Sequence, residues 1–396
     1  MSTAATGTET SGPSRSFKDT IASKWVQRGL AAAAVAFAII LPQFMDSGGS
    51  WMNDLTLVLA YMIMALGLNV VVGFAGLLDL GYVAFYALGA YTVGWFASGH
   101  FNNADIHIFA SEFASNLPGI HVNFLLIIPI AALIAGLIGM VIGFPTLRLR
   151  GDYIAIVTLA FGEIIGRAAI NGDEGVFGIG SFNLTNGKIG IQPTDRPDLP
   201  FLEPFTGLEL RPWYYLALAL ALIVIFINLR LRDSRLGRAW IAVREDEVAA
   251  VSMGIPTVKV KLLAYAIGAA MGGVSGAFLG AYLEGINADS FLFSFSIFIL
   301  AMIILGGLGS IWGVVLGAAV LSLINTRLIP DVLNPVVKDA IDFDLTQLSF
   351  GIFGFLLVIM MVLRPQGILP EKRREAELTE NLEGFGDDDQ TVEVRA

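Results

Sequence analysis

Long apolar runs constrain this chain more than any other feature of its sequence. They recur from about residue 29 to about residue 363 and are separated by polar connections. About 20 apolar residues are enough for a helix to cross the hydrocarbon core of a bilayer. Inside lipid the backbone can satisfy its own hydrogen bonds as a helix. Because 55% of the residues are hydrophobic and only 15% are charged, the sequence predicts an all-α polytopic membrane protein.

Ten apolar runs qualify as membrane-spanning helices. The predicted spans cover residues 29–45, 55–72, 82–98, 122–146, 153–170, 212–229, 262–283, 291–306, 311–328 and 347–363. The first run follows several basic residues, as a secretory signal would, but no cleavage-site pattern precedes Asp46. We therefore interpret it as a retained first helix.

The basic residues indicate how the spans are oriented, because Lys and Arg are retained on the cytoplasmic side. If the N-terminus lies inside, the outer connections contain only Lys188, Arg196, Arg211 and Lys338. This asymmetry predicts about ten helices with cytoplasmic N- and C-termini. Five helices then precede the central cytoplasmic segment and five follow it. This arrangement predicts a 5+5 inverted repeat.

Three regions follow from this reading. Residues 1–28 form a cytoplasmic N-terminal extension, residues 29–370 form the transmembrane domain, and residues 371–396 form an acidic, disordered cytoplasmic tail. Within the transmembrane domain, residues 230–261 form a cytoplasmic loop and residues 171–211 form an outer loop. Regularly spaced glycines, such as Gly268 and Gly272, predict close helix packing.

Several kinds of chemistry are excluded. The chain has no cysteine, so disulfides, Cys-ligated metals and thiol nucleophiles are absent. Its three histidines, His100, His107 and His121, lie in one polar connection without the spacing of a helical metal motif, and we expect them to be solvated. Gly187 and Lys188 do not belong to a phosphate-binding loop. The chain is therefore predicted to bind no cofactor and to catalyse no reaction.

Charged residues within the apolar runs are costly and commonly functional. Glu163 and Arg167 lie four residues apart on the fifth span, where they share a helix face and can pair. This pair either lines a polar translocation path or is a neutralised structural pair near the end of the helix.

Two glycine-rich breaks, at residues 69–91 and 304–318, interrupt the apolar pattern. Irregular backbone at membrane depth is tolerated where it is buried in protein or faces a cavity, so these breaks are candidates for the translocation path. Tight cytoplasmic turns are the alternative. The path candidates in the first break are Asn69, Gly73, Gly76, Tyr82, Phe85 and Tyr86.

The segment "LGRAWIAVREDEVAAVSMGI", residues 236–255, is too polar and too short to span a membrane. As one helix it would place apolar groups largely on one side, at Trp240, Val243, Glu247, Val251 and Met253 to Ile255, with Arg238, Arg244, Glu245 and Asp246 spread over the rest. Such a helix suits docking into a groove on a soluble partner. A helix on the membrane surface, or a solvated loop, fits the pattern as well.

Five segments resemble the LivM-type permease subunits of bacterial branched-chain amino acid ABC importers. They are "NVVVGFAGLLDLGYVAFYALGAYT", "GFPTLRLRGDYIAIVTLAFGEI", "LGRAWIAVREDEVAAVSMGIPTVKVKLLAYAIGA", "MIILGGLGSIWGVVLGA" and "LRPQGILP". They occur in the family's order and together cover most of residues 69–370. The chain departs from the family around residues 174–184, where a short turn is expanded.

The resemblance implies a permease subunit in a bacterial inner membrane that imports leucine, isoleucine and valine. Its implied partners are the bilayer, a LivH-like second permease subunit, LivG-like and LivF-like ATPase subunits that use the ATP, and a periplasmic or surface amino-acid-binding protein, with no nucleic acid. A urea or short-amide importer and an ion-coupled carrier are the alternatives. The implied ATPase-coupling residues are Gly237, Arg238, Ala239, Arg244, Glu245, Asp246, Glu247, Ala249, Met253 and Gly254.

Overall fold

The computed structural model describes residues 24–109, 116–147, 153–173, 183–199, 205–341, 344–364 and 366–369. Most of the predicted N-terminal extension, the predicted acidic tail and the centre of the expanded 174–184 segment lie outside these residues. The described chain is helical apart from one small sheet. Its main helices are α2 (Lys24–Ile40), α3 (Ser50–Asn69), α4 (Val83–Phe96), α5 (Phe124–Thr146), α6 (Tyr153–Ile170), α7 (Arg211–Arg232), α8 (Arg235–Glu245), α9 (Glu247–Ser252), α10 (Thr257–Tyr282), α11 (Phe293–Gly306), α12 (Ile311–Leu323), α13 (Asn334–Ile341) and α14 (Ser349–Leu363).

Each predicted span overlaps one of these helices, and a polytopic helical architecture follows. Within the described residues, seven helical segments are long and apolar enough to cross a membrane. They are Ser50–Phe74, Phe124–Thr146, Tyr153–Ile170, Arg211–Arg232, Thr257–Tyr282, Ala288–Gly306 and Ile311–Lys338. Ala33–Phe44, Val83–Phe96 and Ser349–Leu363 are shorter apolar helices. The count of ten spans and the 5+5 repeat stay predictions.

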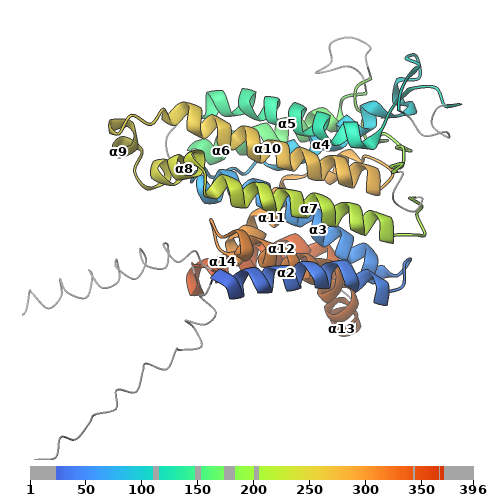
Figure 1. The fold of residues 1–396 in the computed structure, drawn as a ribbon. Helices are drawn as coiled ribbons and strands as arrows, with labels where there is room; N and C mark the ends of the chain where they lie inside the picture. The colour runs from blue at the N-terminus through green and yellow to red at the C-terminus, as the bar shows by residue number, and fades with distance from the viewer. Residues whose placement is uncertain are drawn as a thin grey trace, which may run out of the picture.

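Helix α10 is the centre of the larger helix group, where it packs against α3, α4 and α5 (Figure 1). Its glycines permit this close packing. A Cβ atom added at Gly268 would lie 2.9 Å from the carbonyl oxygen of Gly67, and one at Gly273 would lie 2.7 Å from that of Ala131. Helix backbones in lipid associate closely where side chains are small. The glycine spacing therefore has the packing role predicted for it.

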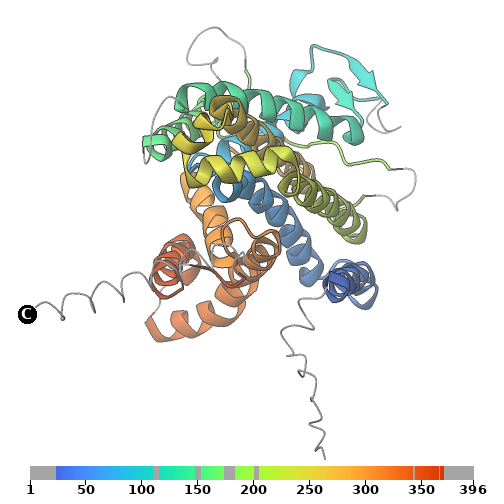
Figure 2. The same ribbon diagram turned by 60° about the vertical axis from the view of Figure 1, so that its left-hand side comes forward.

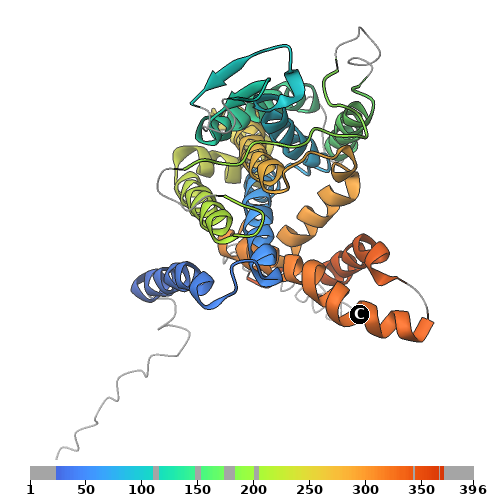
Figure 3. The same cartoon turned by 90° about the vertical axis from the view of Figure 1, so that its right-hand side faces the viewer.

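Helices α11, α12 and α14 form a second group that joins the first through α3 (Figure 2). In Figure 3 the dark blue α2 and the orange-to-red helices of this group lie on opposite sides of α3. Helix α2 is tied to α7 by Tyr214, whose hydroxyl donates a hydrogen bond to the carbonyl oxygen of Ala38 over 2.9 Å.

The small sheet contains β1 (Ala97–Ser98), β2 (Ile106–Ile108) and β3 (Ile120–Val122) in the order β1-β3-β2. Strand β3 is antiparallel to β1 and parallel to β2. Residues 183–199 run alongside, since the Asp195 N–H donates to the Ala97 carbonyl over 2.7 Å. We call the sheet together with residues 183–199 the β cap. Figure 1 shows the β cap at one end of α10 and the α8–α9 pair at the other.

Two helices widen into π-helical turns, η2 (Val70–Phe74) after α3 and η6 (Ile324–Leu333) after α12. Such turns are rare and occur often at functional sites. The first lies in the predicted break at residues 69–91, whereas the second was not predicted from the sequence.

Candidate functional site

The two glycine-rich breaks meet in the structure. The Asn69 side-chain oxygen accepts a hydrogen bond from the Gly309 N–H over 3.0 Å, although the two residues are 240 positions apart. A Cβ atom added at Gly73 would lie 2.7 Å from the Gly309 nitrogen. Asn69 is fully buried, and its amide nitrogen has no hydrogen-bond partner among the residues the structure describes. The breaks therefore form one buried junction with unused hydrogen-bonding capacity.

Backbone conformation explains the glycines at this junction. Gly76 has φ +70° and Gly307 has φ +118°, a region that residues with a side chain rarely adopt. The closing motif "LRPQGILP" also reaches this place, because the Leu369 N–H donates to the Gly306 carbonyl over 3.0 Å. Segments that are distant in the sequence thus converge at one end of the helix bundle.

The aromatic path candidates close the space between α4, α10 and α11 in this conformation. The Tyr82 hydroxyl donates to the Gly268 carbonyl over 2.7 Å, and the Phe85 ring packs edge-on against Tyr82. The Tyr86 ring lies 5.3 Å from the Phe291 ring. Because all three candidates are buried, a path along them requires α4 to separate from α10 and α11.

Glu163 and Arg167 lie apart from this junction, on an exposed part of α6. Their Oε2 and Nε atoms are 3.9 Å apart, and the side chains are 49% and 75% exposed within this chain. The predicted pairing is therefore present, at a separation that contributes little to stability in water. Their role in a translocation path stays a prediction.

Asp79 is a residue of this junction that sequence reasoning missed. Its Oδ1 atom accepts a hydrogen bond from the Gly81 N–H over 2.8 Å, which fixes the turn into α4. The Oδ2 atom is buried without a partner in the described part of the chain. Burial raises the pKa of Asp79 to about 6, against the smaller lowering effect of the Gly81 hydrogen bond. The sequence pattern that could have pointed to Asp79 is a single acidic residue among apolar ones, in "LLDLG".

The 236–255 segment folds as two helices, which corrects the single helix expected from its pattern. The chain extends at Asp246, with φ −151° and ψ 107°, between α8 and α9. The Asp246 carboxylate accepts hydrogen bonds from the N–H groups of Val248 and Ala249 over 2.8 and 2.9 Å. It thus caps α9 in the manner of an N-cap aspartate.

Helix α8 is fastened to the first break. The Trp240 side chain is fully buried, donates to the Val260 carbonyl over 2.7 Å and stacks on Phe74. The Arg244 guanidinium donates to the Gly73 carbonyl, and its methylene groups cover Gly76. Arg244, expected at the partner surface, therefore points into the bundle instead.

Helix α9 carries the exposed side of the segment. Val248, Val251 and Met253 are 76%, 55% and 83% exposed. The apolar face predicted to join Trp240 and Val243 to Val251 and Met253 was wrong, because the bend at Asp246 separates a buried pair from an exposed pair.

The other predicted coupling residues occupy several environments. Gly237 is buried, Ala239 is half-buried, and Arg238 donates to the Asp233 carbonyl over 2.9 Å. Glu247 pairs with the buried Lys261 over 2.6 Å. Glu245, Asp246, Ala249 and Gly254 are exposed together with Met253. Their contact with an ATPase stays a prediction.

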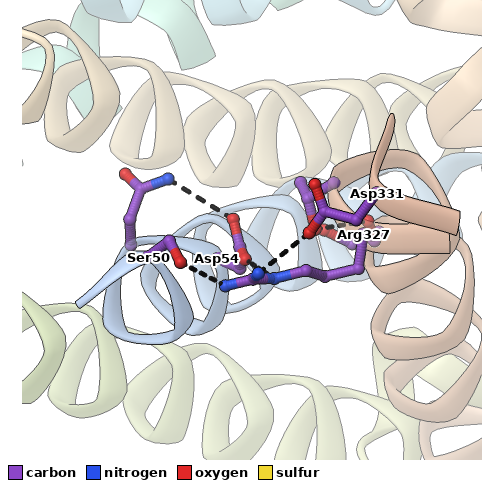
Figure 4. A network of polar contacts seen from close by, with 7 residues as sticks. Ser50, Asp54, Arg327 and Asp331 are labelled. Carbon is purple, nitrogen blue, oxygen red and sulfur yellow. Dashed lines mark hydrogen bonds and ion pairs between the residues drawn. The ribbon is translucent and has the colours of Figure 1, made fainter. Parts of the chain in front are cut away.

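A charged network at the other end of α3 was also missed (Figure 4). Arg327 of η6 pairs with the buried Asp54 of α3, with Asp331 over 2.9 Å, and with the Ser50 hydroxyl over 2.8 Å. Its guanidinium also lies 4.4 Å from the centre of the Trp51 ring. The network ties η6 to α3.

The β cap corrects the expectation of solvated histidines for His121 and in part for His100, whereas His107 is exposed as expected. His121 is 1% exposed, and its Nδ1 atom lies 2.7 Å from Asp195 Oδ2. The His107 ring stacks on it with 5.3 Å between ring centres. His100 is half-buried, with Nε2 3.1 Å from the Asn183 carbonyl. The described residues contain no cluster of three or more potential metal-ligating side chains.

Comparison with known proteins agrees with this geometry. The family described as "Branched-chain amino acid transport system / permease component" matches residues 51–362. The permease protein LivM of the high-affinity branched-chain amino acid transport system of Escherichia coli K12 is 37% identical over 372 residues, covering 89% of this chain and 77% of the relative. A probable LivM of Methanocaldococcus jannaschii is 28% identical over 333 residues, covering 79% of this chain and 91% of the relative.

A second kind of permease is also similar. The permease protein LivH of the same type of system in Salmonella typhimurium LT2 is 27% identical over 330 residues, covering 80% of this chain and 93% of the relative. No solved structure matches the chain at a significant level. Both the matched range and the identity to LivM show that the chain belongs to the family of branched-chain amino acid transport system permease components.

Proposed function

We propose that this chain is the LivM-type permease subunit of an ATP-driven importer of leucine, isoleucine and valine in a bacterial inner membrane. The observation that supports this proposal most is the connection between α8–α9 and the glycine junction. One side of the segment is exposed and apolar on α9, and the other is anchored by Trp240 and Arg244 to Phe74 and Gly73. An isolated carrier has no need for such an exposed element.

This arrangement and the relatives support the following partners. A second, LivH-like permease subunit completes the membrane part, and LivG-like and LivF-like ATPases bind below it. The exposed Val248, Val251 and Met253 suit a groove on an ATPase, as amphipathic helices commonly bind soluble partners. A periplasmic or surface binding protein delivers the amino acid at the β-cap end.

Coupling then works through a short mechanical path. ATP binding moves the paired ATPases, and α9 follows the groove in which it is docked. Helix α8 transmits this movement through the Trp240–Phe74 stack and the Arg244 hydrogen bond to the junction of the two breaks. A bistable helix bundle responds by changing the side to which the path opens. The path passes Asn69, Gly73, Gly76, Tyr82, Phe85 and Tyr86, and the chain itself breaks no bond.

Uptake of labelled leucine tests the proposal. We expect uptake in cells that carry the complete importer and none when the ATPase genes are removed. Undiminished uptake by the permease subunits alone, abolished by a protonophore, would establish an ion-coupled carrier instead. Competition by urea or short amides, without competition by isoleucine or valine, would identify the complex as a urea or short-amide importer.

Variants of α9 test the docking surface. Val251→Glu and Met253→Glu place charge on exposed apolar positions, and we expect both to lower co-purification of the ATPases at least tenfold. Val258→Glu, on an exposed residue of α10 near its start, is the matched control. Normal ATPase recovery with both α9 variants would contradict the docking surface while leaving the leucine result unaffected.

A further inference from the structure

An apolar groove runs along the membrane-facing side of α5, α7 and α10, away from the glycine junction. It encloses a volume of about 450 Å³. Its floor consists of small residues, among them Ala132 and Gly136 of α5 and Ala266 and Ala270 of α10. The larger set of lining residues includes no charged side chain.

The shape of the groove suits a narrow, flexible occupant. Leu133 and Leu137 on α5 and Ile223 on α7 are exposed and rise on its two sides, being 62%, 49% and 54% exposed. Small residues therefore lie between ridges of branched side chains, so the groove is a narrow slot and not a flat face, and we call it the slot. From Ile128 to Met140 the slot extends for about 18 Å along α5, comparable to one leaflet of a bilayer core, about 15 Å thick.

One wall of the slot is adaptable. Met271 lines it, and its sulfur accepts a hydrogen bond from the buried Asn228 amide over 3.4 Å. An unbranched thioether adjusts to occupants of irregular shape.

Two basic residues lie beyond the lining of the slot, on the side toward α8 and α9. On α7, Arg230 follows Ile227 and Ile223 at helical spacing, and on α10, Lys259 precedes Leu263 and Ala266 in the same way. Figure 1 shows that the last turn of α7 and the first turn of α10 lie at this same end. Both side chains are exposed there.

Charge pairing separates each of these two residues from the basic residue two positions further along its own helix. Arg232 has Asp233 at 3.4 Å, and Lys261 has Glu247 at 2.6 Å. Within the described residues neither Arg230 nor Lys259 forms an ion pair, and the Arg230 guanidinium instead lies 5.4 Å from the centre of the Phe226 ring. Two unneutralised cations therefore mark the end of an apolar slot.

We propose that this slot binds an anionic phospholipid, with one acyl chain between α5, α7 and α10 and the phosphate between Arg230 and Lys259. Basic sites between membrane helices on the cytoplasmic side recognise anionic headgroups in this way. A lipid held here fills the space between α7 and α10 directly beside α8. The site is independent of the amino-acid path and of the nature of the substrate.

Lipid retention by the purified importer tests the proposal. The complete complex is prepared in nanodiscs of phosphatidylglycerol and phosphatidylcholine in equal amounts, transferred to mild detergent, and examined by native mass spectrometry. We expect one phosphatidylglycerol to remain bound in preference to phosphatidylcholine. Each basic residue near a headgroup contributes about fivefold, so the double variant Arg230→Gln/Lys259→Gln should lose about 25-fold in this preference.

Two controls make the result specific. Lys188→Gln/Lys338→Gln removes the same charge elsewhere and should retain wild-type preference. Ala132→Phe fills the floor of the slot and should release lipids of both kinds, whereas Ala219→Phe, on an exposed part of α7 outside the slot, should not. Equal lipid retention in the Ala132→Phe and wild-type complexes would overturn the proposal.

A protein occupant is the remaining outcome, and it would also overturn the proposal. The chain has no cysteine, so Leu133→Cys introduces a single thiol into the slot. If the second permease subunit covers the slot, this thiol should form a high-yield cross-link to that subunit with a short bifunctional reagent. If lipid fills the slot, bromine-substituted phosphatidylglycerol should quench a fluorophore attached at this thiol, and the cross-link should be absent.

Discussion

At the scale of single residues, the charges of η6 and α3 make different contributions to stability. The Asp54 side chain is 8% exposed and that of Asp331 is 54% exposed, yet both bind Arg327. Removing one partner of a buried pair is costly, since the other charge is left without compensation. Exposed pairs contribute little, because water already solvates them. Removing Asp54 or Asp331 in turn therefore compares a buried with an exposed ion pair on the same arginine.

We expect Asp54→Ala to lower the free energy of unfolding by about 2 to 4 kcal/mol, and Asp331→Ala by less than about 1 kcal/mol. Thermal unfolding in detergent, followed by tryptophan fluorescence, measures the difference. Trp51 lies against Arg327 and so also reports locally on the network. Equal destabilisation by the two variants would mean that Asp54 has no special role in holding η6.

Asp79 predicts a dependence of stability on pH. Its pKa is raised from 3.8 to about 6 by burial, so the folded state binds the proton more tightly than the unfolded state does. The stabilising effect of the bound proton is complete below about pH 4 and is lost as the pH rises through 6. We expect Asp79→Asn to keep the Gly81 hydrogen bond, to melt higher than wild type at pH 7, and to lack this dependence between pH 4 and 6. A variant that melts lower at pH 7 would show that the carboxylate itself is required.

Sequence reasoning found Asn69 and Gly73 of the junction but neither Asp79 nor the partners of these residues. Asn69 and Gly73 stand in a recognisable break, so their importance followed from local pattern alone. Arg327 lies within a predicted apolar span and pairs with Asp54, 273 residues away. No local pattern encodes such a pair. For the same reason the contact of Arg244 with Gly73 was not predicted, because only the folded chain places the two residues side by side.

At the scale of elements, the lengths of the apolar runs predicted the helices well, and a side-chain cap marks the break between α8 and α9. The span expected at 153–170 coincides with α6, and the one expected at 122–146 exceeds α5 by two residues at its start. The bend at Asp246 was missed because the amphipathic pattern continues through it. The π-helical turns were missed because their wider ladder depends on tertiary contacts and not on composition.

The Asp246 cap gives a prediction for α9. Replacing an N-cap aspartate by alanine costs about 1 kcal/mol, which is large for a helix of six residues. We expect Asp246→Ala to increase hydrogen exchange at residues 247–252 and to lower leucine uptake severalfold, while the melting temperature of the bundle changes little. Asp246→Asn keeps an oxygen acceptor and should restore both. Unchanged exchange in the alanine variant would show that the cap does not hold α9.

Helix α8 predicts a separation of ATP hydrolysis from transport. Trp240→Ala removes the Phe74 stack and the Val260 hydrogen bond, at a cost of about 3 to 5 kcal/mol for a buried aromatic. Trp240→Phe keeps an aromatic ring to stack on Phe74 and loses the hydrogen bond together with part of the buried indole volume. In reconstituted complexes we expect the alanine variant to hydrolyse ATP with little uptake and the phenylalanine variant to retain most uptake. Parallel loss of both activities in the two variants would argue against transmission through this stack.

At the scale of the whole molecule, the orientation of the chain links the other proposals. The α8–α9 pair and the β cap lie at opposite ends of α10 (Figure 1). If ATPases bind one end, a binding protein must approach the other. The same orientation sets the leaflet in which the groove between α5, α7 and α10 opens. A single topological measurement therefore bears on all these surfaces.

Cysteine accessibility provides that measurement, because the chain has no native cysteine to interfere. Lys188→Cys places a thiol at an exposed position of the β cap, and Lys259→Cys places one at the exposed start of α10. We expect a membrane-impermeant maleimide to label the first in intact cells and the second only after the membrane is opened. This pattern follows from the excess of basic residues on the cytoplasmic side. Labelling in the reverse order would place α9 outside the cell, where no ATPase could reach it.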